Sequence, residues 1–457
     1  FDDFEGKTAR TVNFLVSPSV RLEVHAAGRP LPGECGWTAE FEGIALDGVA
    51  AGFVVKLERA AGAGDCSNMG EQRALAVAVS FPGHELSMTV GDVERMVFAP
   101  QGPSLDHFVR EHTRGQAWVT GKVVPVRTKR EYGCLEYDAL VEAVVDELYG
   151  KEDLRRYRRL LIFLPMLPGE CYWGGLGTGN CTRRDWLPNH WFSISWMRVP
   201  KNMDQGAWNW VMGVVHHEVG HNFGFAHSNS RRFPSVPLGA SEEKGESGEY
   251  GDPYTIMGGA GGPFTARQLH HAGWISDSQI LTAEAEGTYT IETVAAQNLG
   301  PKVLRIRRFA GVDEWLWVEY HKPEGPYYAR WPSVAPQGAL IYVLDSHNRD
   351  ASSTHGGPPN LLDMTPGSRK EDFHDAILAN GREWVDVFSG ISIKAVDASN
   401  RLTVTVSRNR PCATVDAVQK THGHGGETGE IRVTAPSSCR WEAVSSALWI
   451  HLTGQTS

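Results

Sequence analysis

Three histidines and a glutamate are spaced so that they could hold a metal ion and activate a water molecule. They lie in the run His217-Glu218-Val219-Gly220-His221-Asn222-Phe223-Gly224-Phe225-Ala226-His227. We expect a helix over residues 210–222, in which His217 and His221 leave the same face one turn apart. Neutral imidazole is a common zinc ligand, and two nitrogens one turn apart can bind one tetrahedral ion. The spacing therefore predicts a zinc site.

Glu218 and Gly224 complete this pattern. Glu218 is rotated off the ligand axis, so its carboxylate can lie over the metal without binding it, where a general base for water must sit. Gly224 can adopt positive φ, end the helix and bring His227 round as a third nitrogen ligand. Three protein ligands leave a fourth position open, which is typical of catalytic zinc. A chance grouping on an ordinary helix is the alternative, and the turn glycine and third histidine argue against it.

This eleven-residue run resembles the signature of metzincin metalloproteases. Tyr254-Thr255-Ile256-Met257-Gly258-Gly259 is similar to the methionine turn that lies beneath the metal in that clan. Within the clan the chain is most similar to the gametolysin family, over residues 1 to about 409. Gly259 stands where some metzincins carry a tyrosine ligand, so no fifth ligand is expected from this turn.

The resemblance implies a zinc metalloendopeptidase. It assigns Zn²⁺ to the three histidines, the general base to Glu218, and to Met257 a structural place as the apolar floor under the metal. Proteases of this type act on extracellular glycoproteins, so the implied substrate is an extracellular protein or glycoprotein. Two other functions stay open: an extracellular binding or adhesion protein built on a protease scaffold, and a zinc hydrolase of a non-peptide bond.

The fold class expected is an α/β metzincin-type catalytic domain, with a mixed sheet and the zinc helix, flanked by β-rich domains. Apolar runs at residues 74–81 and 159–165 are typical of buried central strands. A further strand is expected at residues 117–126, and helices at 105–112, 137–149 and 268–274. The domains expected are a β-rich propeptide-like domain (1–66), the catalytic domain (72–275), a β-sandwich (276–409) and a partial immunoglobulin-like module (410–457).

The β-rich parts are predicted from short apolar or alternating runs between turns. In the first part they cover residues 12–16, 20–24 and 52–57; in the antiparallel sandwich they cover 288–294, 303–308, 315–320, 339–344, 391–396 and 402–406. The first part resembles the gametolysin propeptide, and an independent β-domain without an inhibitory task is the alternative. The last part resembles bacterial BACON-type repeats cut short, and carbohydrate or another surface ligand is a candidate for what it binds.

Two segments near the zinc motif have a functional and a plain interpretation. The aromatic stretch His190–Met197 resembles the edge strand with which metzincins pair an extended substrate, or it is a plain sheet strand. The segment after Ser228 could offer hard oxygen ligands to Ca²⁺, or it is a solvated loop, since it lacks an EF-hand spacing. Its acidic residues are Glu242, Glu243, Glu246, Glu249 and Asp252.

The chain has seven cysteines, none in a C-x-x-C spacing. Cys171 and Cys181 bracket a glycine-rich loop, and Cys412 and Cys439 bracket a hairpin-like region, so both pairs are expected to be disulfides. Disulfides favour an oxidising, extracytoplasmic location.

An odd number of cysteines leaves at least one thiol over. Cys66, or less readily Cys35, could place its thiolate on the open zinc position and hold the enzyme latent. The alternative is a Cys35–Cys66 disulfide, with Cys134 as the odd cysteine.

The composition bounds the remaining partners. A net charge of -10 argues against binding a phosphate backbone, so no nucleic-acid partner is expected. No stretch is apolar enough to span a bilayer. The chain begins at Phe1 without a signal-peptide pattern, which is compatible with a removed secretory leader. We therefore expect a secreted protein.

Overall fold

A computed structural model of the 457-residue chain divides it into two compact units, one of residues 1–66 with 182–192 and one of residues 67–181 with 193–457. Residues 2–59 are described by their strands alone. Side chains are described for 67–167, 169, 171, 173–182, 184, 190–241, 243–259, 262–328, 331–333, 335, 337–345, 360–368 and 373–408, and for scattered positions from 415 to 453.

The first unit consists of β-strands, and the three strands expected within residues 1–66 are present. Two sheets are formed in it, one pairing β1 with β2 and one in the order β3-β4-β6-β5. Strand β11 also pairs with the first half of β12 in this unit. The strands are β1 (Asp2–Glu5), β2 (Thr8–Thr11), β3 (Asn13–Val16), β4 (Arg21–Ala27), β5 (Trp37–Leu46), β6 (Val49–Arg59), β11 (Thr182–Arg184) and β12 (Leu187–Val199).

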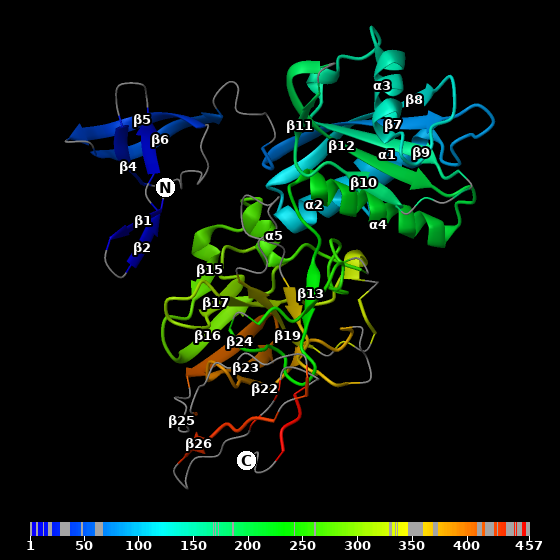
Figure 1. Ribbon diagram of the computed structural model, residues 1–457. Coiled ribbons are helices and arrows are strands. Elements are labelled where there is room, and N and C mark those ends of the chain that lie inside the picture. The colour runs from blue at the N-terminus through cyan, green and yellow to red at the C-terminus, as the bar shows by residue number, and fades with distance from the viewer. Residues whose placement is uncertain are drawn as a thin grey trace. The chain divides into compact units, whose positions relative to one another are not determined.

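The second unit begins with a mixed sheet whose central strands are the two predicted apolar runs (Figure 1). Its order is β10-β12-β9-β7-β8, with β12, β9, β7 and β8 parallel and β10 antiparallel to β12. The added strands are β7 (Gly70–Ser80), β8 (Ala117–Arg127), β9 (Arg159–Pro165) and β10 (Gly175–Gly177). The prediction of a mixed sheet is confirmed.

Helices cover both faces of this sheet (Figure 1). Helices α1 (Val90–Phe98), α2 (Leu105–Thr113) and α4 (Gln205–Asn222) share one core with Met197 of β12. The next residue back, Trp196, points to the opposite face, where its indole donates to the carbonyl of Tyr137 in α3 (Tyr137–Leu148). Helix α1 was not predicted from the sequence, although the capping box of Thr89 with Asp92 is a local signal for it.

A sandwich of two sheets follows, with one core shared between them. The larger sheet has the order β14-β13-β20-β19-β18-β17-β15, and β21 pairs with β19; the smaller is β16-β24-β23-β22. Its members are β13 (Asn229–Arg232), β14 (Glu246–Gly248), β15 (Ile280–Thr282), β16 (Gly287–Glu292), β17 (Val303–Arg307), β18 (Trp315–Tyr320), β19 (Gly338–Leu344), β20 (Asn360–Leu362), β21 (Leu378–Ala379), β22 (Glu383–Asp386), β23 (Ile391–Ala398) and β24 (Arg401–Arg408). All six strands predicted here are present.

The six strands predicted for the antiparallel sandwich do pair antiparallel with one another, but two further pairs in the larger sheet are parallel. β13 runs parallel to β20, and β15 runs parallel to β17. β13 and β14 come from the polar segment that directly follows His227, which the sequence did not mark as strands. Short elements complete the unit: α5 (Ala266–His271), η1 (Leu154–Arg156), η2 (Asp277–Gln279), η3 (Pro326–Tyr328), β25 (Thr414–Val415) and β26 (Val433–Thr434).

A buried ion network joins the two sheets of the sandwich. Arg308, which follows β17, donates to Glu314 at 2.6 Å and to both carboxylate oxygens of Asp386 in β22, at 2.6 and 2.9 Å. All three side chains are at most 3% exposed. Their charges are therefore removed from water and depend on one another.

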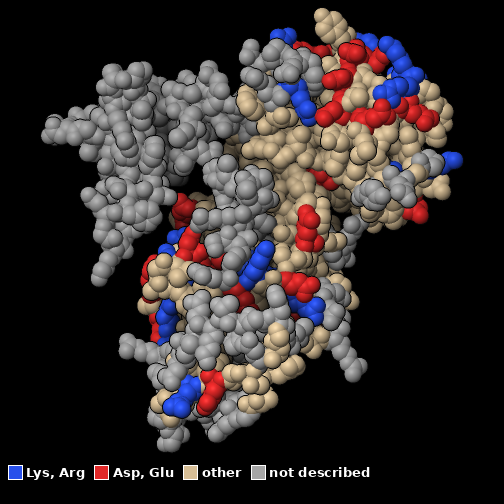
Figure 2. All heavy atoms as spheres, in the orientation of Figure 1, with Lys and Arg blue, Asp and Glu red and all other residues tan. Residues whose placement is uncertain are grey.

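The exterior carries both signs of charge. Figure 2 shows acidic and basic side chains interspersed over the described part of the visible face. Among the helices that the structure describes, none is long and apolar enough to cross a membrane.

Candidate metal centre

Helix α4 carries the histidines and is fastened to the sheet at its C-terminal end. Asn222 accepts a hydrogen bond from Ser195 at 2.8 Å and donates to the carbonyl of Ile194 at 3.1 Å. Arg159, fully buried, donates to the carbonyl of Asn222 at 2.9 Å. A cation suits the negative end of a helix dipole, although burial lowers the pKa of Arg159 to about 9. The last turn of α4 is thereby fixed against β9 and β12.

The chain turns back after α4 as its glycine predicts. Gly224 has φ +90°, and the amide of Phe225 donates to the carbonyl of Gly220 at 3.1 Å. This turn returns His227 toward the helix, and its Nε2 lies 3.1 Å from Nε2 of His221. One possible ligand atom from each of His217, His221 and His227 lies within 4.8 Å of the other two. Among the described residues, no other histidine, cysteine, aspartate and glutamate side chains form such a group.

The other ring nitrogen of each histidine is held by an acceptor. Nδ1 of His217 lies 2.7 Å from the carbonyl of Ile256, Nδ1 of His221 lies 2.8 Å from that of Phe225, and Nδ1 of His227 lies 2.8 Å from Oε1 of Glu249. Carbonyl and carboxylate oxygens only accept, so each Nδ1 donates its hydrogen to them, and Nε2 is the nitrogen left to bind a metal.

The spacing of these Nε2 atoms fits a zinc ion. Nε2 of His221 lies 3.1 Å from Nε2 of His227. Nitrogen ligands with bonds of about 2.0–2.1 Å around a tetrahedral zinc ion are roughly 3.3 Å apart. The donor chemistry and the spacing of His221 and His227 therefore both suit the ion that the sequence predicts.

Burial sets the protonation of the two helix histidines and of Glu218. It lowers the pKa of His217 to about 4 and that of His221 to about 3, so both rings are neutral at pH 7. Burial also raises the pKa of Glu218 to about 8, and a divalent cation beside it would act in the opposite direction. The Glu218 residue is only 6% exposed.

Strand β10 lies against α4 so closely that only glycine fits. A Cβ on Gly175 would meet Oε1 of Glu218 at 2.7 Å, and one on Gly177 would meet the Glu218 carbonyl at 2.5 Å. A Cβ on Gly174 would meet the ring of Trp210 at 2.6 Å. These glycines give the Glu218 carboxylate its space. The sequence showed them only as a glycine-rich loop.

Met257 packs against helix α4. The residue is fully buried, and a Cβ on Gly220 would meet its Sδ at 2.3 Å. The sulfur therefore packs against α4 at Gly220, a residue that lies between His217 and His221 in the sequence. The carbonyl of Met257 accepts from the amide of Ser228 at 2.8 Å. The turn is tight, since a Cβ on Gly258 would meet the carbonyl oxygen of Asp252 at 1.9 Å.

A buried carboxyl fixes this turn to the sandwich. Asp252 accepts from the amide of Tyr254 at 2.8 Å and from the hydroxyl of Tyr342 in β19 at 3.0 Å. Burial raises its pKa to about 7, the two hydrogen bonds lower it, and the charge of Glu319 raises it further.

We expect Asp252→Asn to change how stability depends on pH. The pKa of Asp252 is about 7 in the folded chain against 3.8 ordinarily, so the folded state binds more protons between these values. The unfolding free energy therefore falls as pH rises through this window, by at most about 1.4 kcal/mol per pH unit from this group. Urea unfolding at pH 4.5 to 7.5 should show a smaller fall for the variant. An unchanged fall would contradict the assignment.

The aromatic stretch His190–Met197 is not an edge strand. Residues 195–197 of β12 pair on one side with Gly175–Gly177 of β10 and on the other with β9. β10 is the edge strand of the sheet instead. The glycine-rich loop between Cys171 and Cys181 forms this strand. Its sequence Gly-Leu-Gly gives no local signal for a β-strand.

The predicted pair Cys171–Cys181 is wrong. Cys171 forms a disulfide with Cys134, and Cys181 is also disulfide-bonded. Cys134 is thus not the odd cysteine. The pair lies 37 residues apart with Cα atoms 5.7 Å apart, and the sequence offered no spacing rule for it. The predictions for Cys35, Cys66, Cys412 and Cys439 lie outside the described residues.

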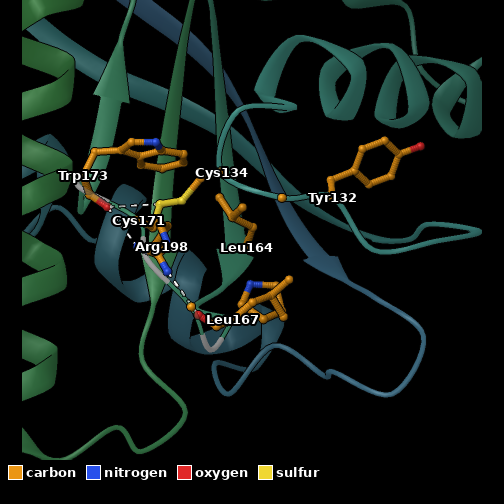
Figure 3. Close-up of a pocket in the computed structure, with 10 residues that line it drawn as sticks. Tyr132, Cys134, Leu164, Leu167, Cys171, Trp173 and Arg198 are labelled. Carbon is orange, nitrogen blue, oxygen red and sulfur yellow. Dashed lines mark hydrogen bonds between the residues drawn. A yellow bond between two sulfur atoms is a disulfide. The ribbon is translucent and has the colours of Figure 1, made fainter.

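The Cys134–Cys171 disulfide borders a cavity of about 210 Å³ (Figure 3). Arg198 lines it and donates to the carbonyls of Trp173 and Leu167 at 3.1 and 3.3 Å. The cavity lies at the carboxyl ends of β9 and β12, and none of the three histidines lines it. Arg198 closes the loop after β9 through these carbonyls, so we assign the cavity a structural part.

The acidic residues considered for Ca²⁺ have separate partners. Glu249 faces His227, Asp252 faces Tyr342, and Glu243 accepts from the amide of Ala240 at 3.0 Å. Glu246 lies in β14, and Glu242 is outside the described residues. A calcium site stays a prediction.

Sequence reasoning missed two residues at the histidine cluster. Glu249 bonds His227, and the ring of Tyr250 lies 3.7 Å from that of His227 between centroids. Both follow β14, whose pairing with β13 brings them back to the cluster. Without knowledge of that pairing, their distance from the motif in sequence gives no signal.

The comparisons with known proteins leave the family open. No protein-family model matches the chain, and no curated protein matches it. Two crystal structures of wild-type OgpA from Akkermansia muciniphila are distantly similar. The first covers 76% of this chain and 97% of that one at 12% identity and a TM-score of 0.29; the second covers 76% and 95% at 13% and 0.27. Superpositions this loose carry no argument, so the site is interpreted from its own geometry.

Proposed function

We propose that the chain is a zinc endopeptidase of the metzincin type, similar to gametolysin. The observation that carries the proposal is the convergence of one ring nitrogen from each of His217, His221 and His227 within 4.8 Å of the others, at the helix that also carries the buried Glu218. His217, His221 and His227 would hold the ion. Zinc bound there supplies Lewis-acid chemistry, which polarises the scissile carbonyl and makes a water molecule more acidic.

Glu218 moves the proton. Its carboxylate takes a proton from the attacking water as the new C–O bond forms, and passes it to the leaving nitrogen as the C–N bond breaks. One water is consumed, and an acid and an amine are released. The glycines of β10 leave the Glu218 side chain room to reach both the attacking water and the leaving nitrogen.

The edge strand β10 is the proposed place for the substrate backbone. The backbone amide of Arg198 in β12 donates to the carbonyl of Gly174, and the amide of Thr178 donates to the carbonyl of Ile194 in β12. Because backbone groups alternate in direction along a strand, those of Gly175 and Gly177 face away from β12. An extended peptide can add there as a further strand, next to Glu218. The substrate class proposed is extracellular protein or glycoprotein, and the Cys134–Cys171 disulfide supports an extracytoplasmic location.

An adhesion protein on an inactive scaffold is a weaker candidate. It would need neither the convergence of three histidine nitrogens nor the space kept for the Glu218 side chain. The motif alone does not decide between a peptide bond and another hydrolysable bond.

The test is hydrolysis of a denatured protein by the purified chain. Cleavage should occur after loading with zinc, stop with a zinc chelator, and return when zinc is added back. A zinc-loaded, folded chain that cleaves no peptide bond, but hydrolyses a model ester, would favour the non-peptide alternative.

We expect His227→Ala to weaken zinc binding strongly, because it removes one of three nitrogens. Glu249→Gln keeps all three ligands but replaces the carboxylate that orients His227, so it should cost about 10- to 100-fold in affinity. Competition with a chromophoric chelator measures both, and His227→Ala should lose more than Glu249→Gln. Wild-type affinity in His227→Ala would remove His227 from the ligand set.

A further inference from the structure

We propose that Tyr250 is a further catalytic residue, whose phenol donates a hydrogen bond to the oxygen of the scissile carbonyl as that oxygen gains negative charge. The inference rests on the proposed function. Tyr250 lies in the turn after β14, outside both the zinc motif and the methionine turn, so the proposal gives this turn a catalytic role.

Tyr250 is placed at the cluster by its contacts. Its ring is 3.7 Å from that of His227 and 5.8 Å from that of His217, at interplanar angles of 34° and 26°. It therefore lies beside two of the proposed ligands, which is where a reacting carbonyl must come.

The backbone holds Tyr250 there at a cost. Tyr250 has φ +58°, a left-handed conformation that a tyrosine rarely adopts. Its amide donates to the side chain of Asn229 at 3.3 Å, and the β13–β14 pairing fixes the turn from behind. Gly248 and Gly251 approach so closely that a Cβ on either would lie 2.7 or 2.0 Å from Oγ of Ser230. Strain kept by such close packing is common at functional sites.

Tyr250 supplies a hydrogen-bond donor for the substrate's carbonyl oxygen that the histidines and Glu218 do not supply. The three histidines direct their Nδ1 hydrogens to Ile256, Phe225 and Glu249. Glu218 as a carboxylate only accepts. Tyr250 adds an O–H to this set, and its residue is 43% exposed, so a substrate can reach it.

The step asks for no proton transfer from Tyr250. The phenol keeps its proton, and Glu218 carries the proton from water to the leaving nitrogen. A hydrogen bond aimed at charge that develops only in the transition state raises kcat and leaves substrate binding nearly unchanged.

The test variant is Tyr250→Phe, which keeps the ring against His227 and removes only the hydroxyl. We expect kcat for a peptide substrate to fall about 100- to 1000-fold, as when one oxyanion donor is removed, with KM within a few-fold of wild type. Zinc stoichiometry and zinc affinity should be unchanged. A phosphinic peptide, tetrahedral at the reacting centre, should bind more weakly to the variant, whereas the parent peptide should bind equally to both in a Glu218→Gln background.

Tyr289→Phe is the matched control, since its hydroxyl donates to the carbonyl of Ala285 within the sandwich at 2.7 Å. Its kcat should equal that of wild type. Equal kcat and equal phosphinic-peptide binding in Tyr250→Phe would overturn the role of Tyr250 while the protease function stands. Loss of zinc from Tyr250→Phe would show a structural role and also overturn it. A zinc-loaded wild type that cleaves no peptide would overturn both proposals together.

Discussion

Glu218→Gln is expected to retain zinc and lose activity by about a hundred- to ten-thousand-fold, the usual contribution of a general base. The amide has the same shape as the carboxyl, so it fits beside Gly175 and Gly177. It cannot take a proton from water at neutral pH. Because Glu218 is not among the three proposed ligands, metal content should not change.

Initial rates on a protein substrate and metal analysis of the same samples check this. Glu246→Gln is the control, because Glu246 is an exposed glutamate in β14. It should cleave at the wild-type rate. If Glu218→Gln cleaved as fast as that control, the base would have to be another group.

Arg308→Met is expected to cost about 3–5 kcal/mol of unfolding free energy, as measured when one partner of a buried ion pair is removed. Methionine fills much of the space but leaves the carboxylates of Glu314 and Asp386 buried without their cation. The network joins the two sheets of the sandwich, so the substitution should weaken the packing of one sheet on the other.

Urea unfolding followed by tryptophan fluorescence measures the change. Arg155→Met is a matched control, because Arg155 and its partner Asp153 are 70% and 50% exposed. Exposed ion pairs contribute little, so its midpoint should stay near that of wild type. An Arg308→Met midpoint equal to that of the control would contradict the stabilising role assigned to this buried network.

Local patterns allowed much of the fold to be predicted. The apolar runs now seen as β7 and β9 are buried from both faces, and burial on both faces requires such continuous runs. The three histidines could be grouped from sequence because a helical turn and a glycine reversal fix short-range geometry. Helix α4 begins at Gln205, earlier than predicted, because Asp204 caps it by accepting from the amide of Ala207.

Long-range pairing could not be predicted in the same way. The partner of Cys171 depends on how the loop before α3 approaches β9, and no local spacing encodes that approach. β13 and β14 have the short, polar sequences Asn229–Arg232 and Glu246–Gly248, which become strands only because β20 offers β13 a parallel edge. Glu249 and Tyr250 reach the cluster through that pairing, so they were missed with it.

The interleaving of the segment that follows the histidine cluster with the large sheet limits how this chain could be divided or recombined. β13 and β14 are encoded between His227 and Met257, whereas β20, the strand that receives β13, is encoded more than a hundred residues later. A fragment ending at residue 275 would keep β13 with an unpaired edge, which invites association with other chains. It would also lose Tyr342, the partner of Asp252 beneath the methionine turn. Exchange of the sandwich between related proteins would therefore have to carry the loop after His227 with it.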